Sequence, residues 1–267
     1  MKKVRKIRKN YRTFFLLLPS LMGFSIFYVI PFFRSIYYAF VDNAFHLEFA
    51  GIQNFREIFG SEHFRLALKN TLLFTAIVVP VSLLSAILIA SVLMQIHPII
   101  AGGVQSALFL PVLLPSAAVT LFWKTYLFFL PPFISLLIFY MWKYIGLYVM
   151  LMLCGMVSVE REILEAASID GADGWRRLWQ IEVPCIRSAV FFVGVLCVVN
   201  AFKIYRESFL LYGTYPDESV YMLQNYLNNH FDKLNYQYIS AASVCFTGIL
   251  AGITIYAFTR ERQADGR

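Results

Sequence analysis

Long apolar runs that are almost free of charge constrain this chain more than any other feature of its sequence. A membrane core about 30 Å thick needs roughly 20 apolar residues in a helix, and several runs reach that length. Hydrophobic residues make up 59% of the 267 residues and charged residues only 15%, against roughly 25% charged residues in an average soluble domain. The sequence therefore predicts an all-α polytopic membrane protein.

Six segments are long and apolar enough to be predicted as membrane spans: 13–40, 70–94, 104–126, 133–156, 187–211 and 239–259. They predict a membrane domain over 13–259, with short tails at 1–12 and 260–267 and a polar loop at 157–186. Prolines recur within or beside these spans, and each tends to kink its helix. These prolines are Pro19, Pro31, Pro80, Pro111, Pro115, Pro131 and Pro132.

The basic N-terminus followed by the apolar stretch Phe14 to Phe33 has the order of a secretory signal peptide. The stretch is too long for a signal peptide, and no small-residue cleavage site follows it. We interpret it as a retained first span.

The distribution of Lys and Arg predicts the orientation in the membrane. The N-terminal tail carries seven of these residues, the 157–187 stretch four and the C-terminal tail three, so 14 of 23 fall on one predicted side. Positive charge is retained on the cytoplasmic side of a membrane. We therefore expect both termini and the 157–186 loop in the cytoplasm, and we attribute the net charge of +7 to orientation rather than to nucleic acid.

Cysteine and histidine are arranged without the spacing of a metal or redox site. The four cysteines lie in or beside apolar runs with no CxxC spacing, and the four histidines are scattered through connecting segments. Small buried hydrophobic side chains are the simpler interpretation of such cysteines. The sequence predicts no metal site.

The 157–186 loop has an unusual composition for a connecting segment. Its first part lacks Gly and Pro and predicts a short surface helix, which Gly171 can end in the left-handed conformation. Trp175 and Trp179 lie four residues apart on one helical face. Two interpretations remain open from these residues alone: an amphipathic helix resting on lipid headgroups, or a surface on which another protein docks.

The spacing within this loop resembles the EAA loop of ABC importer permeases. The pattern is Glu165-Ala-Ala, three residues, Gly171, nine residues, Ile181, one residue, then Val183-Pro184. That family usually has Leu in place of Val183, and its sugar-permease branch commonly has Pro in place of Glu160.

Other segments resemble the same carbohydrate-uptake branch, in the maltose-type first subunit of a permease pair. They are Leu18–Phe24, Tyr28–Phe32, Gly51–Phe55, Ala67–Thr75, Trp142–Gly146 and Asn200–Tyr205. One departure is clear: the family has an outer segment of some tens of residues after Trp123-Lys124, and here only Thr125 to Pro132 remain.

The resemblance implies the type I importer permease fold and a set of partners in a prokaryotic cell membrane. These partners are a second permease of related fold, two ATPase subunits and an extracytoplasmic solute-binding protein. The chain has no GxxxxGK[ST] motif to cradle phosphates, so ATP and magnesium are expected on the ATPase and the chain itself is expected to be non-catalytic. The residues implied in ATPase coupling are Glu165, Ala166, Ala167, Asp170, Gly171, Ala172, Ile181 and Pro184, on a coupling helix of about Arg161 to Ala172.

Ionisable residues within spans are costly and are therefore candidates for the solute pathway. Lys143 falls about ten residues into the fourth span, and Lys203 and Arg206 fall near the outer end of the fifth. Because sugars are held by aromatic faces and hydrogen bonds, the candidate pathway set is Trp142, Lys143, Asn200, Lys203, Tyr205 and Arg206. The alternative is that these long cations extend to the outer interface.

Three rival functions follow from other features. A membrane-embedded hydrolase would need a nucleophile with a base, yet Asp170 and Asp173 lie in the loop and no histidine falls within a span. A stand-alone channel or carrier would not need an EAA loop. An ABC permease for a glycerol phosphoester would use Lys203 and Arg206 as anion partners.

The GxxxG spacing at 248–252 allows close helix packing, within this chain or against a second permease.

Overall fold

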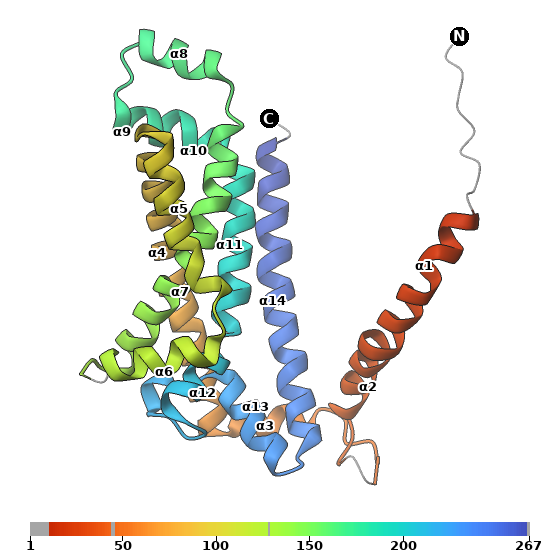
Figure 1. Ribbon diagram of the computed structural model, residues 1–267. Coiled ribbons are helices and arrows are strands. Elements are labelled where there is room, and N and C mark those ends of the chain that lie inside the picture. The colour runs from red at the N-terminus through yellow and green to blue at the C-terminus, as the bar shows by residue number, and fades with distance from the viewer. Residues whose placement is uncertain (1–10, 44–45, 128, 266–267) are drawn as a thin grey trace, which may run out of the picture. The chain divides into compact units, whose positions relative to one another are not determined.

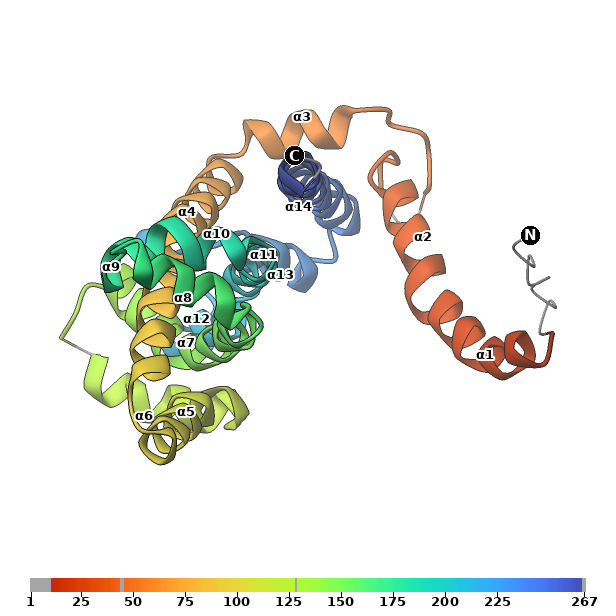
Figure 2. The same ribbon diagram turned by 90° about the horizontal axis from the view of Figure 1, so that it is seen from above.

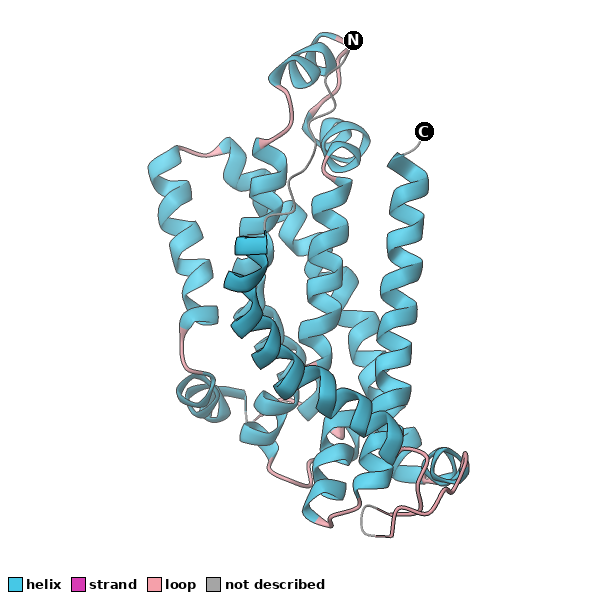
Figure 3. Ribbon diagram, turned by 90° about the vertical axis from the view of Figure 1, so that its right-hand side faces the viewer, coloured by secondary structure: helices cyan, strands magenta, loops and turns pink. Residues whose placement is uncertain are grey.

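The computed structural model describes residues 11–43, 46–127 and 129–265. Contacts divide the chain into two compact units, one of Met1–Ile58 with His230–Thr247, and one of Phe59–Asn229 with Gly248–Arg267. The described residues form helices joined by short loops (Figure 3), apart from one isolated β-bridge between Val41 and Phe49.

The larger unit holds most of the helices. They are α4 (Glu62–Gln95), α5 (Pro98–Leu113), α6 (Ser116–Leu127), α7 (Pro132–Val157), α8 (Arg161–Ile169), α9 (Gly174–Arg177), α10 (Val183–Cys185), α11 (Arg187–Phe202), α12 (Tyr205–Tyr212) and the greater part of α13 (Leu223–Asp232). A π-helical turn, Leu178–Glu182, joins α9 to α10. Figure 1 shows α8 and α9 at one end of α7, with α6 and α12 at the other.

The core of this unit lies around α7, which packs against α4, α5 and α11. Fully buried large side chains on α7 include Leu136, Phe139, Tyr140 and Tyr148. At Gly146 the backbone of α5 comes so close that an added Cβ would stand 1.8 Å from the carbonyl oxygen of Leu108. The crossing of α5 and α7 therefore requires a residue without a side chain at this position.

In the part of the chain that the structure describes, five helical segments are long and apolar enough to cross a membrane, and a bent pair of helices raises the number to six. The five are Leu16–Tyr38, Glu62–Gln95, Pro132–Val157, Arg187–Tyr212 and Tyr236–Tyr256. The predicted number of about six spans agrees with this range. The second span begins earlier than predicted, because the Ser61 hydroxyl accepts a hydrogen bond from the Phe64 amide and caps α4 before the apolar run starts.

The third predicted span differs from the structure. In place of one helix over 104–126, α5 and α6 meet at an angle of 102°. Leu114 is extended, with ψ 145°, because a residue before proline is forced out of the helical region and Pro115 follows it. Figure 1 shows α6 lying across the end of the bundle opposite to α8.

The other prolines take different positions. Pro131 and Pro132 stand at the N-cap and first residue of α7, where a missing amide hydrogen is no loss. Pro31 is the second residue of α2, which continues directly from a π-helical segment within the helical stretch Leu16–Tyr38. Pro19, Pro80 and Pro111 lie inside helices that continue through them.

The smaller unit contains α1 (Tyr11–Phe24), a π-helical segment (Ser25–Val29), α2 (Ile30–Tyr38), most of α3 (Gln53–Gly60) and the first part of α14 (Tyr236–Asp265). The buried amide of Asn54 donates to the carbonyls of Ala39, at 3.0 Å, and Val41, at 2.7 Å, and so closes the loop between α2 and α3. Of the predicted tail 1–12, residues 1–10 lie outside the described residues, and α1 begins at Tyr11.

Candidate functional site

The helix α8 stands off the end of α7 and has a well-defined C-terminus. Gly171 has φ +76°, its amide donates to the Ser168 carbonyl at 3.2 Å, and the Ala172 amide donates to the Ala167 carbonyl at 2.9 Å. This is the Schellman arrangement, which satisfies carbonyls that a helix end leaves free. The prediction that Gly171 ends the helix in the left-handed conformation is confirmed, and α8 covers 161–169 of the predicted 161–172.

Most side chains of α8 are exposed. Glu165, Ala166 and Ile169 are exposed, Ile169 to 87%, whereas Ala167 is buried. A hollow of about 380 Å³ lies between this helix and Arg177 of α9. Figure 2, which views the bundle from above, shows α8, α9 and α10 over the ends of the bundle helices. An exposed apolar side chain beside small residues is a surface that another protein can approach closely.

The return segment after Gly171 is held by local contacts. The Asp173 carboxylate accepts from the Arg176 amide at 3.0 Å and caps α9, and Arg177 pairs with Glu182 at 2.8 Å. Leu178 is buried in the core of the larger unit. The two tryptophans Trp175 and Trp179 contact edge to face, with ring centroids 5.7 Å apart.

The remaining predicted coupling residues lie along the same segment. Asp170 is the C-cap residue of α8, Ile181 is half-buried in the π-helical turn, and Pro184 is exposed in α10. All eight predicted positions therefore fall on one continuous piece of chain at the α8 end of the bundle.

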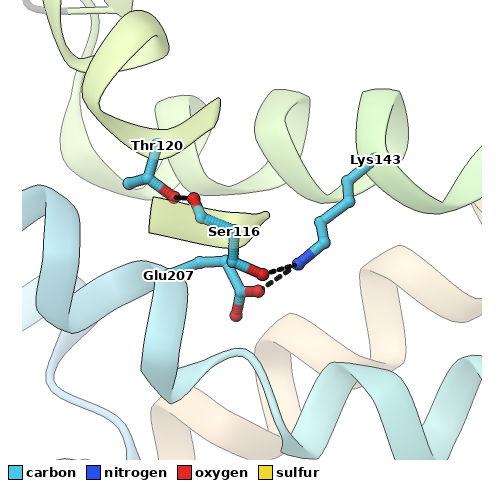
Figure 4. Close-up of polar contacts among 4 residues, drawn as sticks. All are labelled: Ser116, Thr120, Lys143 and Glu207. Atoms are coloured by element: carbon cyan, nitrogen blue, oxygen red, sulfur yellow. Dashed lines mark hydrogen bonds and ion pairs between the residues drawn. The ribbon is translucent and has the colours of Figure 1, made fainter. Parts of the chain in front are cut away.

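A buried ion pair lies near the opposite end of the bundle (Figure 4). The ammonium of Lys143 on α7 pairs with the carboxylate of Glu207 on α12, and it also donates to the Ser116 hydroxyl at 2.8 Å. Lys143 is 5% exposed and Glu207 2%. The Thr120 hydroxyl donates to the Ser116 carbonyl at 2.7 Å, so the cluster joins α6, α7 and α12.

The predicted pathway set includes Lys143 but does not include Glu207 as its partner. A buried lysine is costly unless it is paired. A carboxylate within another apolar segment is therefore the sequence signal that points to a possible partner. The two residues are 64 positions apart, and nothing in the sequence itself shows that they meet.

A second polar cluster links α7 to α11. The Asn200 amide donates to the Tyr148 hydroxyl at 3.1 Å, and the Tyr140 hydroxyl donates to the Cys197 carbonyl at 2.9 Å. The hydroxyls of Tyr140 and Tyr148 are 2.7 Å apart. Because Tyr140 already donates elsewhere, Tyr148 is the donor between them, and the hydrogen bonds run in one direction from Asn200 to the Cys197 carbonyl.

Tyr144 connects these two clusters on the same face of α7. Its ring centroid lies 4.9 Å from that of Tyr140 and 6.3 Å from that of Tyr148, and the Lys143 ammonium lies 5.1 Å from its centre. Tyr144 and Asn200 are half-buried. An aromatic face beside an amide is thus partly open near the middle of the bundle, an arrangement suited to binding by stacking and hydrogen bonding without covalent chemistry.

The other predicted pathway residues are placed differently. Trp142 packs against Trp123, with centroids 5.1 Å apart. Lys203 and Arg206 are exposed, and Tyr205 is half-buried against Phe209. The structure therefore brings Lys143 and Asn200 close to one aromatic face, and it leaves Lys203 and Arg206 on the surface.

Within the described residues, no group of three or more His, Cys, Asp or Glu side chains is placed to hold a metal ion.

No protein-family model matches the sequence. Curated proteins do match it. The chain is 24% identical to the multiple sugar-binding transport system permease protein MsmF of Streptococcus mutans, over 98% of this chain and 99% of that protein. It is 25% identical to the sn-glycerol-3-phosphate transport system permease protein UgpA of Yersinia pestis, over 72% of this chain and 74% of that protein.

Solved structures match the fold. A chain of the bacterial ABC transporter that imports the acidic polysaccharide alginate aligns with a TM-score of 0.82 and 21% identity, over 96% of this chain and 97% of that chain. The same transporter in complex with an alginate pentasaccharide-bound periplasmic protein gives a TM-score of 0.80, at 20% identity and over 96% of both chains. The resemblance to ABC importer permeases seen in the sequence is thus confirmed, and the chain is an integral membrane protein with that fold.

Proposed function

We propose that this chain, similar along its length to ABC importer permeases, forms half of the translocation pathway of an ATP-driven sugar importer. The observation that supports this proposal is the helix α8, which is exposed and has a well-defined C-terminus, on a chain with the fold of ABC importer permeases. Lipid-resting helices present a continuous apolar face, whereas α8 exposes Glu165 and Ala166 beside Ile169 and leaves a hollow next to them. A protein partner fits this mixed surface better than lipid does.

The proposed orientation places α8 and both termini in the cytoplasm, with α6 and α12 near the outer face. The excess of Lys and Arg in the N-terminal tail and around the 157–186 loop supports this orientation. In this orientation α8 lies on the cytoplasmic side of the membrane, where an ATPase subunit can bind it.

The proposed partners are two ATPase subunits, a second permease of related fold and an extracytoplasmic solute-binding protein. One ATPase subunit would bind α8, and ATP and magnesium would be held there, since the chain has no phosphate-binding loop. The chain itself would perform no covalent step. Closure of the ATPase dimer would favour one of two conformations of the pathway through differential contact with α8.

The proposed solute pathway runs past the half-buried face of Tyr144 and Asn200. Asn200 is oriented by its hydrogen bond to Tyr148, and Tyr144 offers a ring on which a sugar can stack. Lys143 lies beside this face but is paired with Glu207. We therefore assign Lys143 to the wall of the pathway rather than to direct contact with the solute.

A glycerol phosphoester is the second candidate cargo, because UgpA of Yersinia pestis is named for sn-glycerol-3-phosphate and Lys203 and Arg206 are exposed cations. The ion pair argues against this cargo, since Lys143, the cation nearest to Tyr144, already has a carboxylate partner. Competition for uptake between neutral sugars and glycerol phosphoesters separates the two.

The proposal is tested by uptake of radiolabelled sugars into proteoliposomes that contain the chain with its partners. The expected result is accumulation that requires ATP and is lost in Glu165→Lys, whose reversed charge lies on the proposed ATPase-binding face. Accumulation by Glu165→Lys at the wild-type rate would contradict the role of α8. Glu48→Lys, at an exposed carboxylate outside α8, controls for the charge change.

A further inference from the structure

A hollow at the start of α4, which we name the α4 pocket, is separate from both polar clusters. Its volume is about 580 Å³, and its lining includes Glu62, Arg65, Lys69, Tyr215, Glu218 and Tyr221. Small-molecule sites commonly have about 300–1,000 Å³, and a disaccharide is a ligand of that size. Glu62, Arg65 and Lys69 of this lining belong to the first turns of α4, and Figure 1 shows that α4 begins at the end of the bundle opposite to α8.

The two walls of the pocket are joined by hydrogen bonds. The Asn70 amide donates to the carbonyls of Glu218, at 2.5 Å, and Tyr221, at 3.1 Å. The Leu223 amide donates to the Thr71 hydroxyl at 2.9 Å. These contacts hold the 218–223 segment against α4 although about 150 residues separate them in sequence. A ligand entering such a pocket orders little additional chain, which favours affinity.

The charges that line the pocket are balanced. Arg65 and Lys69 lie four residues apart on one face of α4, and Glu62 and Glu218 supply two carboxylates. Among the described residues none of these four side chains forms an ion pair within 4.0 Å. A site for an anion would carry an excess of positive charge. Hydroxyl groups both donate and accept hydrogen bonds, so a neutral polyhydroxylated ligand uses the cations and the carboxylates together.

Two tyrosines add aromatic surface. Tyr215 is 73% exposed, whereas Tyr221 is buried and accepts a hydrogen bond from the Asn229 amide at 3.2 Å. Burial raises the pKa of Tyr221, so its hydroxyl keeps its hydrogen at neutral pH and can donate it. An exposed ring next to paired donors and acceptors is a combination that saccharides use, with the ring under the sugar and the polar groups at its hydroxyls.

We propose that the α4 pocket is a second saccharide-binding site, which takes a neutral di- or oligosaccharide at the outer end of the chain. The Tyr144–Asn200 face does not contribute to it. This inference rests on the proposed function for the class of ligand, and its test is an equilibrium binding measurement that does not depend on transport.

The test uses the full chain with its transport partners in lipid nanodiscs, without ATP and without the binding protein. Maltose, lactose and sucrose are titrated, and binding is followed by saturation-transfer NMR. The expected result is that Tyr215→Ala and Lys69→Gln each weaken binding of at least one sugar tenfold or more. Tyr126→Ala, which removes a tyrosine of similar exposure (62%) from α6, leaves this binding unchanged.

Other outcomes overturn the inference. Wild-type affinity in both Tyr215→Ala and Lys69→Gln shows that the α4 pocket holds no saccharide. Absence of sugar binding to the wild type leads to the same conclusion. If the two variants bind sugars normally but lose stimulation of ATP hydrolysis by the binding protein, the pocket is a protein-docking surface instead. ATP-driven uptake by the wild type, measured separately, decides the proposed function independently of these results.

Discussion

Lys143 on α7 and Glu207 on α12 form an ion pair from which water is almost entirely excluded. The pair connects the helix that leads into the α8 loop with the last part of the span Arg187–Tyr212, and through Ser116 it also holds α6. Each charge compensates the other in an apolar surrounding. Removal of one leaves the other buried and unpaired, which is much more costly than the net contribution of the pair.

Glu207→Gln is therefore expected to destabilise the chain by about 3–5 kcal/mol, seen as a lower midpoint of thermal denaturation in nanodiscs. The double variant Lys143→Met with Glu207→Leu removes both charges and should recover most of the loss. Glu48→Gln, which changes an exposed carboxylate, is the matched control. A midpoint for Glu207→Gln equal to that of the wild type would show that the pair is not formed in the membrane.

Gly146→Ala tests the close crossing of α5 and α7. The added Cβ would meet backbone atoms of Leu108 at 1.8 and 2.2 Å, and the helices must separate to admit it. Overpacking of this kind typically costs about 1–3 kcal/mol, so the denaturation midpoint should fall. Gly102→Ala, where an added Cβ has nothing within 4 Å, should leave it unchanged. Equal midpoints for the two variants would refute the crossing geometry.

Gly171→Ala tests the end of α8. Gly171 has φ +76°, and a residue with a side chain adopts this left-handed conformation at a cost of about 1–2 kcal/mol. The substitution therefore weakens the hydrogen bonds that end the helix. We expect the variant to reach the membrane normally but to transport sugar several-fold more slowly, with ATP hydrolysis poorly stimulated by substrate. Gly174→Ala, three residues later and also without neighbours within 4 Å, has no positive φ and should transport at the wild-type rate. The opposite ranking of the two variants would exclude this account of the loop.

Asn200→Ala tests the proposed solute contact. The amide is oriented by Tyr148, and loss of one hydrogen bond to an uncharged ligand costs about 0.5–1.5 kcal/mol. The concentration of sugar that gives half-maximal uptake should therefore rise about 2- to 13-fold, with little change in the amount of protein in the membrane. Asn228→Ala, a half-buried asparagine on α13, serves as the control. An unchanged uptake curve in Asn200→Ala would remove this residue from the pathway.

Much of the fold could be predicted from the sequence because its signals are local. Apolar runs of span length identify Pro132–Val157 and Tyr236–Tyr256 directly. Gly171 was predicted to end a helix from its position after a helix-forming segment, and its backbone does adopt the left-handed conformation. These properties depend on residues close to one another in the chain.

The features that escaped prediction depend on tertiary contact. Pro115 predicts a bend, but the sequence does not predict that the bend reaches 102° between α5 and α6. Lys203 and Arg206 are grouped with Asn200 in the predicted pathway because they lie near one another at the end of the fifth predicted span. In the structure one helix ends at Phe202 and another begins at Tyr205, and Lys203 and Arg206 are exposed whereas Asn200 is half-buried.

The α4 pocket was not predicted either. Arg65 and Lys69 precede the apolar run, and Tyr215 and Glu218 lie in a loop about 150 residues later. The hydrogen bonds of Asn70 and Thr71 with the 218–223 segment show that the two pieces form one site.

The central claim is that α8 couples this pathway to ATP hydrolysis on another subunit, and proteoliposome uptake tests it most directly. Sugar accumulation is measured with ATP, without ATP and with a non-hydrolysable analogue, for the wild type and for Glu165→Lys. The account predicts accumulation only for the wild type with ATP. Equal accumulation by the wild type under all three conditions would contradict it and would identify the chain as an ATP-independent carrier.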